Sequence, residues 1–157
     1  MEKNIQVKAP TILRLTISRY RGIKSLDWYP AGGVNVLLGG GDVGKTTILS
    51  AIGLLLSPTN QTPVWDTDYL SRDTDASFVI EAVFKLPPDS GISNQLKSAW
   101  PWHWNGKEAV VPNTGDPGQE GDPVYRVRVS GGPDLEPLFE IVQPDGTIMD
   151  PRFQTTQ

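Results

Sequence analysis

The chain has 157 residues, a net charge of −4, 16 glycines, 14 prolines and no cysteine. Such a length suits one domain with its own core, and the acidic balance argues against a general polyanion-binding surface. The lack of cysteine excludes disulfides and thiolate metal sites and suits a reducing compartment, while no apolar run reaches the ~20 residues of a membrane helix. The composition therefore predicts a soluble cytoplasmic domain without membrane contact.

The first part of the chain predicts a polar tail followed by two strands. Residues 1–10 are polar and end at a proline, which is typical of a frayed terminus. Thr11 to Arg19 alternates between apolar and polar residues, as a half-buried strand does. After a turn at Arg21-Gly22, residues 23–28 favour a second strand.

A strand and a helix are predicted next, on either side of a glycine-rich loop. The apolar run from Val34 to Leu38 is typical of a strand buried in a parallel sheet. Thr46 to Leu56 has helical spacing of its apolar residues, and Ser57-Pro58 would end the helix. This order predicts a β-loop-α unit.

The second half of the chain predicts mainly strands and turns. Residues 77–86 favour a strand whose buried face carries four apolar side chains, namely Phe78, Ile80, Ala82 and Phe84. Residues 87–123 are an irregular insertion, with a possible helix at 92–100 and a hairpin tip at Asn105-Gly106. Three more strands are expected before a tail at 150–157, at residues 124–129, 138–142 and 147–149.

The loop between the predicted strand and helix carries the chemistry. Its sequence fits the pattern G-x-x-x-x-G-K-[ST] and reads Gly39-Gly40-Gly41-Asp42-Val43-Gly44-Lys45-Thr46-Thr47. Glycines allow positive φ and close approach to an anion, and the backbone N–H groups with the helix N-terminus attract phosphate. We expect Lys45 on the β- and γ-phosphates and Thr46 on Mg²⁺, with Asp42 and Val43 contributing mainly backbone amides. The sequence therefore predicts an ATP and Mg²⁺ site; the alternative is a β-to-α turn that binds nothing.

The order of elements resembles the N-terminal lobe of ABC-type ATPases of the RecF/SMC/OLD group, and the OLD endonucleases look most similar. The resemblance covers residues 11–149 and is carried by 13–17, 21–23, 39–47, 48–52, 55–59, 66–69 and 78–83. It implies an α/β P-loop NTPase lobe with a large antiparallel β component. It also implies that ATP binding is coupled to DNA processing, that two heads form a homodimer, and that Arg21 lies near the nucleotide.

The sequence departs from that family where hydrolysis would occur. No apolar run ends in Asp-Glu, so the metal-shell aspartate and the water-activating glutamate are missing, and no Toprim acidic cluster appears. We therefore assign no catalytic residue and expect a fragment without appreciable ATPase turnover. The alternative is a non-catalytic nucleotide-binding remnant or a partner-binding module.

Further residues have both a functional and a structural interpretation. Val129-Ser130-Gly131-Gly132 is similar to an ABC signature but favours a plain turn, and Gln143, a possible metal contact, favours a hairpin. Asp66 and Asp68 have spacing suited to Mg²⁺, but capping and turn roles are expected. Three tryptophans alternate in the insertion, namely Trp100, Trp102 and Trp104. They could stack on nucleic-acid bases, but we expect them to pack internally.

Overall fold

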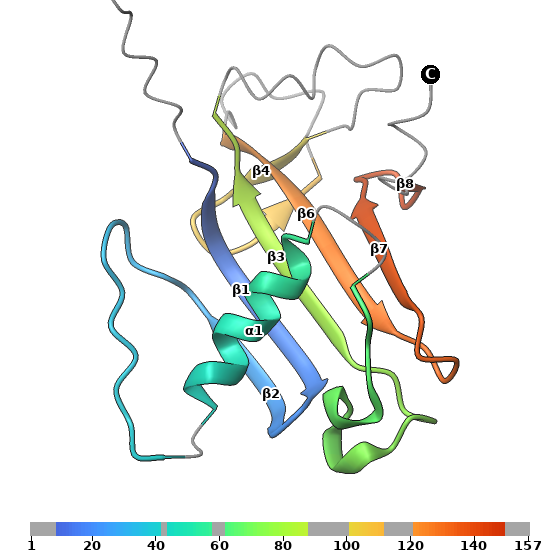
Figure 1. The fold of residues 1–157 in the computed structure, drawn as a ribbon. Helices are drawn as coiled ribbons and strands as arrows, with labels where there is room; N and C mark the ends of the chain where they lie inside the picture. Colours follow the sequence, from blue (N-terminus) through green and yellow to red (C-terminus); the bar gives the residue numbers. More distant parts are fainter. Residues whose placement is uncertain (1–8, 42–43, 58–61, 88–100, 112–120, 150–157) are drawn as a thin grey trace, which may run out of the picture.

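The computed structural model describes residues 9–41, 44–57, 62–87, 101–111 and 121–149. In these residues the chain forms one curved antiparallel sheet with a single α-helix on one face (Figure 1). The helix is α1, Lys45–Leu55, and two short 3-10 helices follow it, η1 at Asp66–Asp68 and η2 at Leu70–Arg72. The described part of the chain is therefore mostly β.

The sheet has eight strands among the described residues, and every pairing in it is antiparallel. Its main path runs β2-β1-β3-β6-β4-β5, and β7 lies beside β6 with β8 beyond it. The strands are β1 Thr11–Tyr20, β2 Ile23–Trp28, β3 Val79–Lys85, β4 Trp102–Trp104, β5 Ala109–Val110, β6 Asp122–Gly131, β7 Pro137–Val142 and β8 Ile148–Met149.

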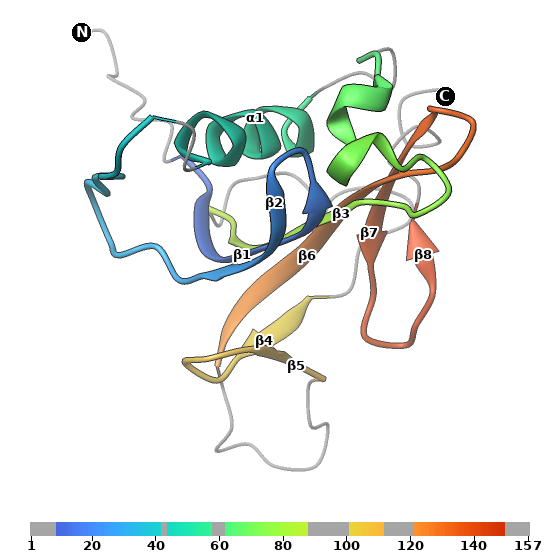
Figure 2. The same ribbon diagram turned by 90° about the horizontal axis from the view of Figure 1, so that it is seen from below.

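The main core lies between the sheet and α1. Side chains alternate between the two faces of a strand, so aligned apolar positions on β1, β3, β6 and β7 face the helix together. Leu15, Ile80 and Val129 have no exposed surface, and Ala51 of α1 is equally buried against them. Figure 2 shows α1 lying along this face. The four apolar residues predicted for one face of the strand at residues 77–86 are all buried, which confirms that prediction.

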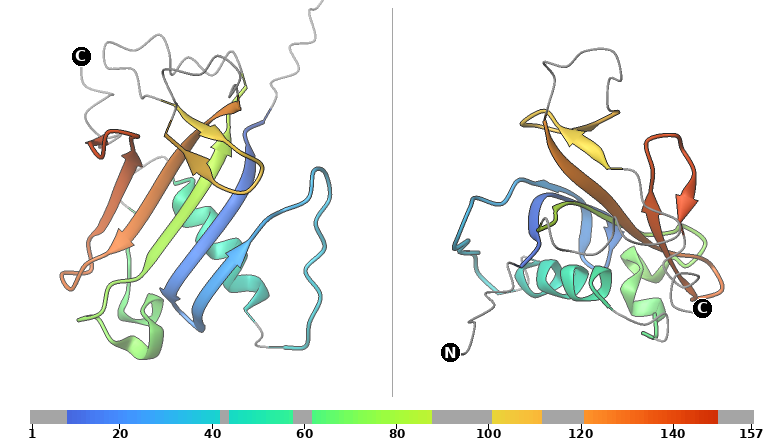
Figure 3. Two further views of the ribbon diagram at one scale, coloured as in Figure 1. Left: turned by 180° about the vertical axis from the view of Figure 1, so that it is seen from behind. Right: turned by 90° about the horizontal axis from the view of Figure 1, so that it is seen from above.

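A smaller core lies on the opposite face, where the β4–β5 hairpin packs (Figure 3). Trp102 is buried with Val83 and Val124, and Trp104 packs against the same cluster. The indole Nε1 of Trp102 donates to the Val142 carbonyl at 2.8 Å. The prediction that these tryptophans pack internally is therefore confirmed for two of them, whereas Trp100 and the possible helix at 92–100 lie outside the described residues.

The hairpins and turns of the second half agree with the sequence. Gly106, with φ of 98°, lies in the predicted tip between β4 and β5. Gly131 ends β6 and Gly132 begins a turn, so the plain-turn interpretation of that motif is confirmed. Gln143 donates its backbone N–H to the Thr147 carbonyl and its side-chain Nε2 to the Thr147 hydroxyl across the last hairpin, as the hairpin interpretation requires.

The predicted fold class is wrong. The sequence suggested an α/β P-loop NTPase lobe, but the described residues form an antiparallel sheet with one helix. The error lies at residues 34–38, which form no strand and pair with no described strand. A parallel sheet needs neighbouring strands joined by crossovers with helices on both faces. In this fold the strand-loop-helix unit contributes only its helix.

Candidate functional site

The helix begins where the sequence motif places it. Gly44 is the residue before α1 and has φ of 87°, a left-handed conformation that side chains rarely adopt. Its carbonyl accepts the first helical hydrogen bond, from Ile48 N at 2.9 Å. A Cβ at this position would lie 3.3 Å from Cγ1 of Ile23, at the start of β2. The left-handed backbone conformation of residue 44 and its close contact with β2 therefore both favour glycine at this position.

The N-terminus of α1 is free to attract an anion. Among the described residues no side chain caps it, and its first turn, which is described in full, contains no acidic residue. The first N–H groups of a helix have no partner within the helix, and the helix dipole adds a partial positive charge there. Thr46, in this first turn, is exposed, and Thr47 is half-buried.

Lys45 closes the glycine loop, which we define as Gly39–Thr47. Its Nζ donates to the carbonyl oxygen of Gly39 at 2.6 Å and also to that of Gly40. The ammonium group thereby joins the beginning of the loop to the beginning of α1. A Cβ on Gly40 or Gly41 would meet nothing within 4 Å, and residues 39–41 are exposed to solvent. Asp42 and Val43 lie outside the described residues.

A metal ion at this place would need ligands from the bound molecule. Within the described segments, no group of three or more His, Cys, Asp or Glu side chains is placed to hold a metal. Mg²⁺ commonly binds through one or two protein oxygens, substrate phosphates and water. Thr46, with its exposed hydroxyl, fits that kind of partial site.

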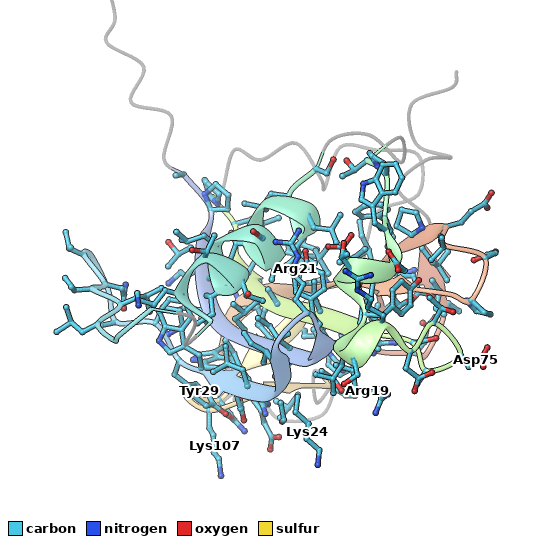
Figure 4. All side chains as sticks on the ribbon, turned by 60° about the horizontal axis from the view of Figure 1, so that its bottom comes forward. Arg19, Arg21, Lys24, Tyr29, Asp75 and Lys107 are labelled. Carbon is cyan, nitrogen blue, oxygen red and sulfur yellow. The ribbon has the colours of Figure 1, made fainter. Side chains whose placement is uncertain are left out.

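Arg21 lies at the β1–β2 corner and points toward the middle of α1, as Figure 4 shows. Its Nε donates to Oδ1 of Asp68 at 2.8 Å, and its Nη1 donates to Oγ of Ser50 at 3.0 Å. These groups line a cavity of about 160 Å³ together with Tyr20 and Leu54. Arg21 is therefore held one to two turns along the helix from Lys45, and its role near a nucleotide stays a prediction.

The two aspartates considered as metal ligands have structural roles. Oδ2 of Asp68 accepts a hydrogen bond from the backbone N–H of Trp65 at 2.9 Å, which caps η1. Asp66 lies 3.7 Å from Nη1 of Arg72. The capping and turn interpretation is confirmed.

A second charged cluster, on the face opposite α1, was not recognised in the sequence. Glu81 of β3 accepts hydrogen bonds from Arg126 and Arg128 of β6, at 2.7 to 3.0 Å. A cavity of about 280 Å³ lies beside it, lined also by Arg14 and Glu108. Strand alternation predicts that such residues face outward together, but only the β3–β6 register brings them into contact.

The comparisons give the predicted family no support. No protein-family model matches the chain, and no curated protein matches its sequence. The structure defines a mostly antiparallel β protein with one helix among its described residues, and this architecture is not that of the predicted ATPase lobe. The prediction that the chain is a lobe of an OLD endonuclease is therefore wrong. It rested on short motifs, which specify local turns without specifying the sheet around them.

Among the described residues, no helix is long and apolar enough to cross a membrane.

Proposed function

We propose that the glycine loop binds the phosphate groups of a nucleoside triphosphate, ATP with Mg²⁺. The observation that carries the proposal is that Lys45 Nζ lies on the Gly39 carbonyl at the start of the glycine loop, while the N-terminus of α1, which no described side chain caps, lies at its end. A phosphate would meet the helix N–H groups and the ammonium group together.

Each residue of the loop would have a separate task. Lys45 would exchange the Gly39 and Gly40 carbonyls for phosphate oxygens, which are stronger acceptors because they carry charge. Gly44 allows the helix to begin with its N–H groups facing the loop. Thr46 would bind Mg²⁺ with its hydroxyl, and the phosphates would supply further oxygens.

Binding without steady turnover is part of the proposal. The sequence contains no apolar run ending in Asp-Glu, the usual source of a metal-shell carboxylate and a water-activating base. Coupling to DNA processing and pairing of ATPase heads were implied only by the family resemblance, and we do not propose them. Phosphate release that is sustained in the wild type and lost in Lys45→Ala would contradict this part.

Calorimetric titration with MgATP tests the binding. Lys45→Ala should weaken binding about 10- to 100-fold, since a hydrogen bond to a charged group contributes about 1.5–3 kcal/mol. The matched control is Lys24→Ala, which removes an exposed lysine of β2. It should leave the affinity unchanged. Equal affinities for wild type and Lys45→Ala would overturn the proposal.

A second pair of variants tests the metal. Thr46→Val removes the hydroxyl and keeps the shape of the side chain, whereas Thr46→Ser keeps the hydroxyl. We expect the increase in ATP affinity on adding Mg²⁺ to disappear in Thr46→Val and to persist in Thr46→Ser. The same Mg²⁺ dependence in all three proteins would remove Thr46 from the site.

A further inference from the structure

The larger cavity of the molecule lies between the sheet and the β4–β5 hairpin, which Figure 3 shows on the face opposite α1. The strand register places Arg14, Val83 and Arg126 side by side across β1, β3 and β6. Glu108 and Ala109 of the hairpin complete the lining. The cavity volume of about 280 Å³ is just below the range of about 300–1,000 Å³ that holds drug-sized ligands, so the cavity suits a smaller molecule.

The lining of this cavity is charged but balanced. It contains two arginines, Arg14 and Arg126, and two glutamates, Glu81 and Glu108, so the formal charge of these side chains sums to zero. Electrostatic complementarity therefore gives neither a simple anion nor a simple cation an overall advantage. The balance favours a ligand that is neutral as a whole and carries a charge of each sign.

Two of the charged groups keep hydrogen-bonding capacity. Arg126 donates from Nε and Nη2 to one oxygen of Glu81, at 3.0 and 2.7 Å, and within the described residues its Nη1 has no acceptor. The carboxylate of Glu108 has no hydrogen-bond or ion-pair partner among the described side chains. Its charge nevertheless acts on the cavity, because it adds to the larger effect of Asp27 in raising the pKa of Arg14. The cavity thus offers a free donor and a free acceptor of opposite charge.

The donor is held in place before any ligand binds. The guanidinium group of Arg126 is fixed by Glu81, and its carbon lies 4.7 Å from the ring centroid of Trp102. Only 25% of the Arg126 side chain is exposed. A group that is already ordered loses little conformational entropy on binding. Beside it, the lining also contains two aliphatic side chains, Val83 and Ala109, which can contact an apolar part of a ligand.

We propose that this cavity binds the zwitterion of a small aliphatic α-amino acid. The carboxylate of the ligand accepts a hydrogen bond from Nη1 of Arg126, and its ammonium group donates to the carboxylate of Glu108. Its side chain lies against Val83 and Ala109. Both ligand charges then have a charged partner, in a site whose own charge is zero. The site uses no residue of the glycine loop, so binding here does not depend on nucleotide.

Calorimetric titration with L-valine and two truncated analogues tests the ligand class. We expect valine to bind with a Kd of about 1 mM or lower. Isovalerate lacks the ammonium group and isobutylamine lacks the carboxylate. Each analogue should bind about tenfold or more weakly than valine, because it leaves one charged group of the cavity without a partner. Changes in backbone amide chemical shifts on adding valine should centre on β3, β5 and β6 and leave α1 unaffected.

A matched pair of variants tests the ammonium contact. Glu108→Gln should weaken valine binding about tenfold or more and should not weaken isovalerate binding, because isovalerate has no ammonium group to lose. Glu136→Gln is the control, since it makes the same change at an exposed glutamate between β6 and β7. It should leave valine binding unchanged. Lys45→Ala should also bind valine as the wild type does, which separates this site from the proposed nucleotide site.

Three results would overturn the proposal. One is the absence of binding at about 10 mM valine, roughly ten times the weakest expected Kd. Another is equal affinity for isovalerate and valine, which would indicate a site for simple carboxylates. The third is an equal effect of Glu108→Gln and Glu136→Gln on valine binding. Far-ultraviolet circular dichroism should show that both variants fold as the wild type does, because both glutamates are exposed.

Discussion

Arg21 and Asp68 are joined twice across 47 residues of sequence. The side-chain Nε of Arg21 donates to Oδ1 of Asp68 at 2.8 Å, and the backbone N–H of Arg21 donates to the Asp68 carbonyl, also at 2.8 Å. The carboxylate is almost buried, with 7% of its side chain exposed, whereas 40% of the Arg21 side chain is exposed. The pair therefore fixes η1 to the β1–β2 corner at one end of the sheet.

Removal of the Asp68 charge should destabilise the fold. Asp68→Asn keeps the shape of the side chain but weakens its bonds to Arg21 and to the Trp65 N–H. We expect a loss of about 1–3 kcal/mol in the free energy of unfolding, below the range for fully buried pairs because Arg21 is partly solvated. Urea denaturation measures it. Asp66→Asn, which affects an exposed pair, should stay within about 0.5 kcal/mol, and equal effects would contradict the prediction.

Substitution of alanine for Gly131 and for Gly53 should change the free energy of unfolding in opposite directions. A Cβ on Gly131 would lie 2.3 Å from Cε1 of Phe78 and 2.6 Å from the Tyr69 hydroxyl oxygen. Gly131→Ala should therefore cost about 1–3 kcal/mol, as overpacking does. Gly53 lies within α1, where a Cβ meets nothing, so Gly53→Ala should add about 0.5–1 kcal/mol. Thermal unfolding of both variants tests the pair, and the same direction of shift in both would refute it.

Replacement of the buried Trp102 should lower the free energy of unfolding more than replacement of the exposed Trp65. Its indole donates to the Val142 carbonyl, and the guanidinium carbon of Arg126 lies 4.7 Å from its ring centroid. Trp102→Phe removes the donor and leaves the carbonyl without it, which should cost about 1–3 kcal/mol. Trp65→Phe is the control, since Trp65 is 62% exposed, and should cost less than about 0.5 kcal/mol. Chemical denaturation decides between these values, and a neutral Trp102→Phe would be contrary evidence.

The strands and the helix could be predicted from the sequence because their signals are local. Alternation located β1, β3 and β6, and the helix starts within one residue of the predicted Thr46. The fold class could not be inferred in this way, because it depends on which strands pair. The run Val34–Leu38 has the composition of a buried strand, but no described strand lies beside it.

In the candidate site, too, the residues that are contiguous in the sequence could be predicted, and the contacts between distant residues could not. The glycine loop was found from its motif because its residues are contiguous, and the start of α1 at Lys45 agrees with that motif. The bonds from Arg21 to Asp68 and from Arg126 to Glu81 join residues 45 or more positions apart. Such pairs depend on strand register and on the path of the loops, which composition and periodicity do not specify.

Two buried tyrosines and one half-buried tyrosine should make the fold sensitive to high pH. Burial raises the pKa of the phenols of Tyr20, Tyr69 and Tyr125. At Tyr20 the charge of Arg21 opposes this shift and that of Asp68 adds to it, whereas at Tyr69 the carboxylates of Asp134 and Asp68 both raise the pKa further. A folded-state pKa above the unfolded value of about 10 means that the folded protein holds these protons more tightly. The resulting stability is complete below about pH 10 and is lost as the pH rises through the folded-state values.

The measurement is urea unfolding from about pH 9 to about pH 11, which brackets the pKa of an unfolded tyrosine. Stability should decline over this range, and Tyr20→Phe should make the decline shallower because phenylalanine has no proton to lose. Replacement of all three tyrosines by phenylalanine should reduce the slope further. The Tyr69 substitution will also lower stability at every pH, since its hydroxyl donates to the Gly132 carbonyl, so the slope is the quantity to compare. A slope that is the same in wild type and Tyr20→Phe would show that this phenol does not contribute to the alkaline transition.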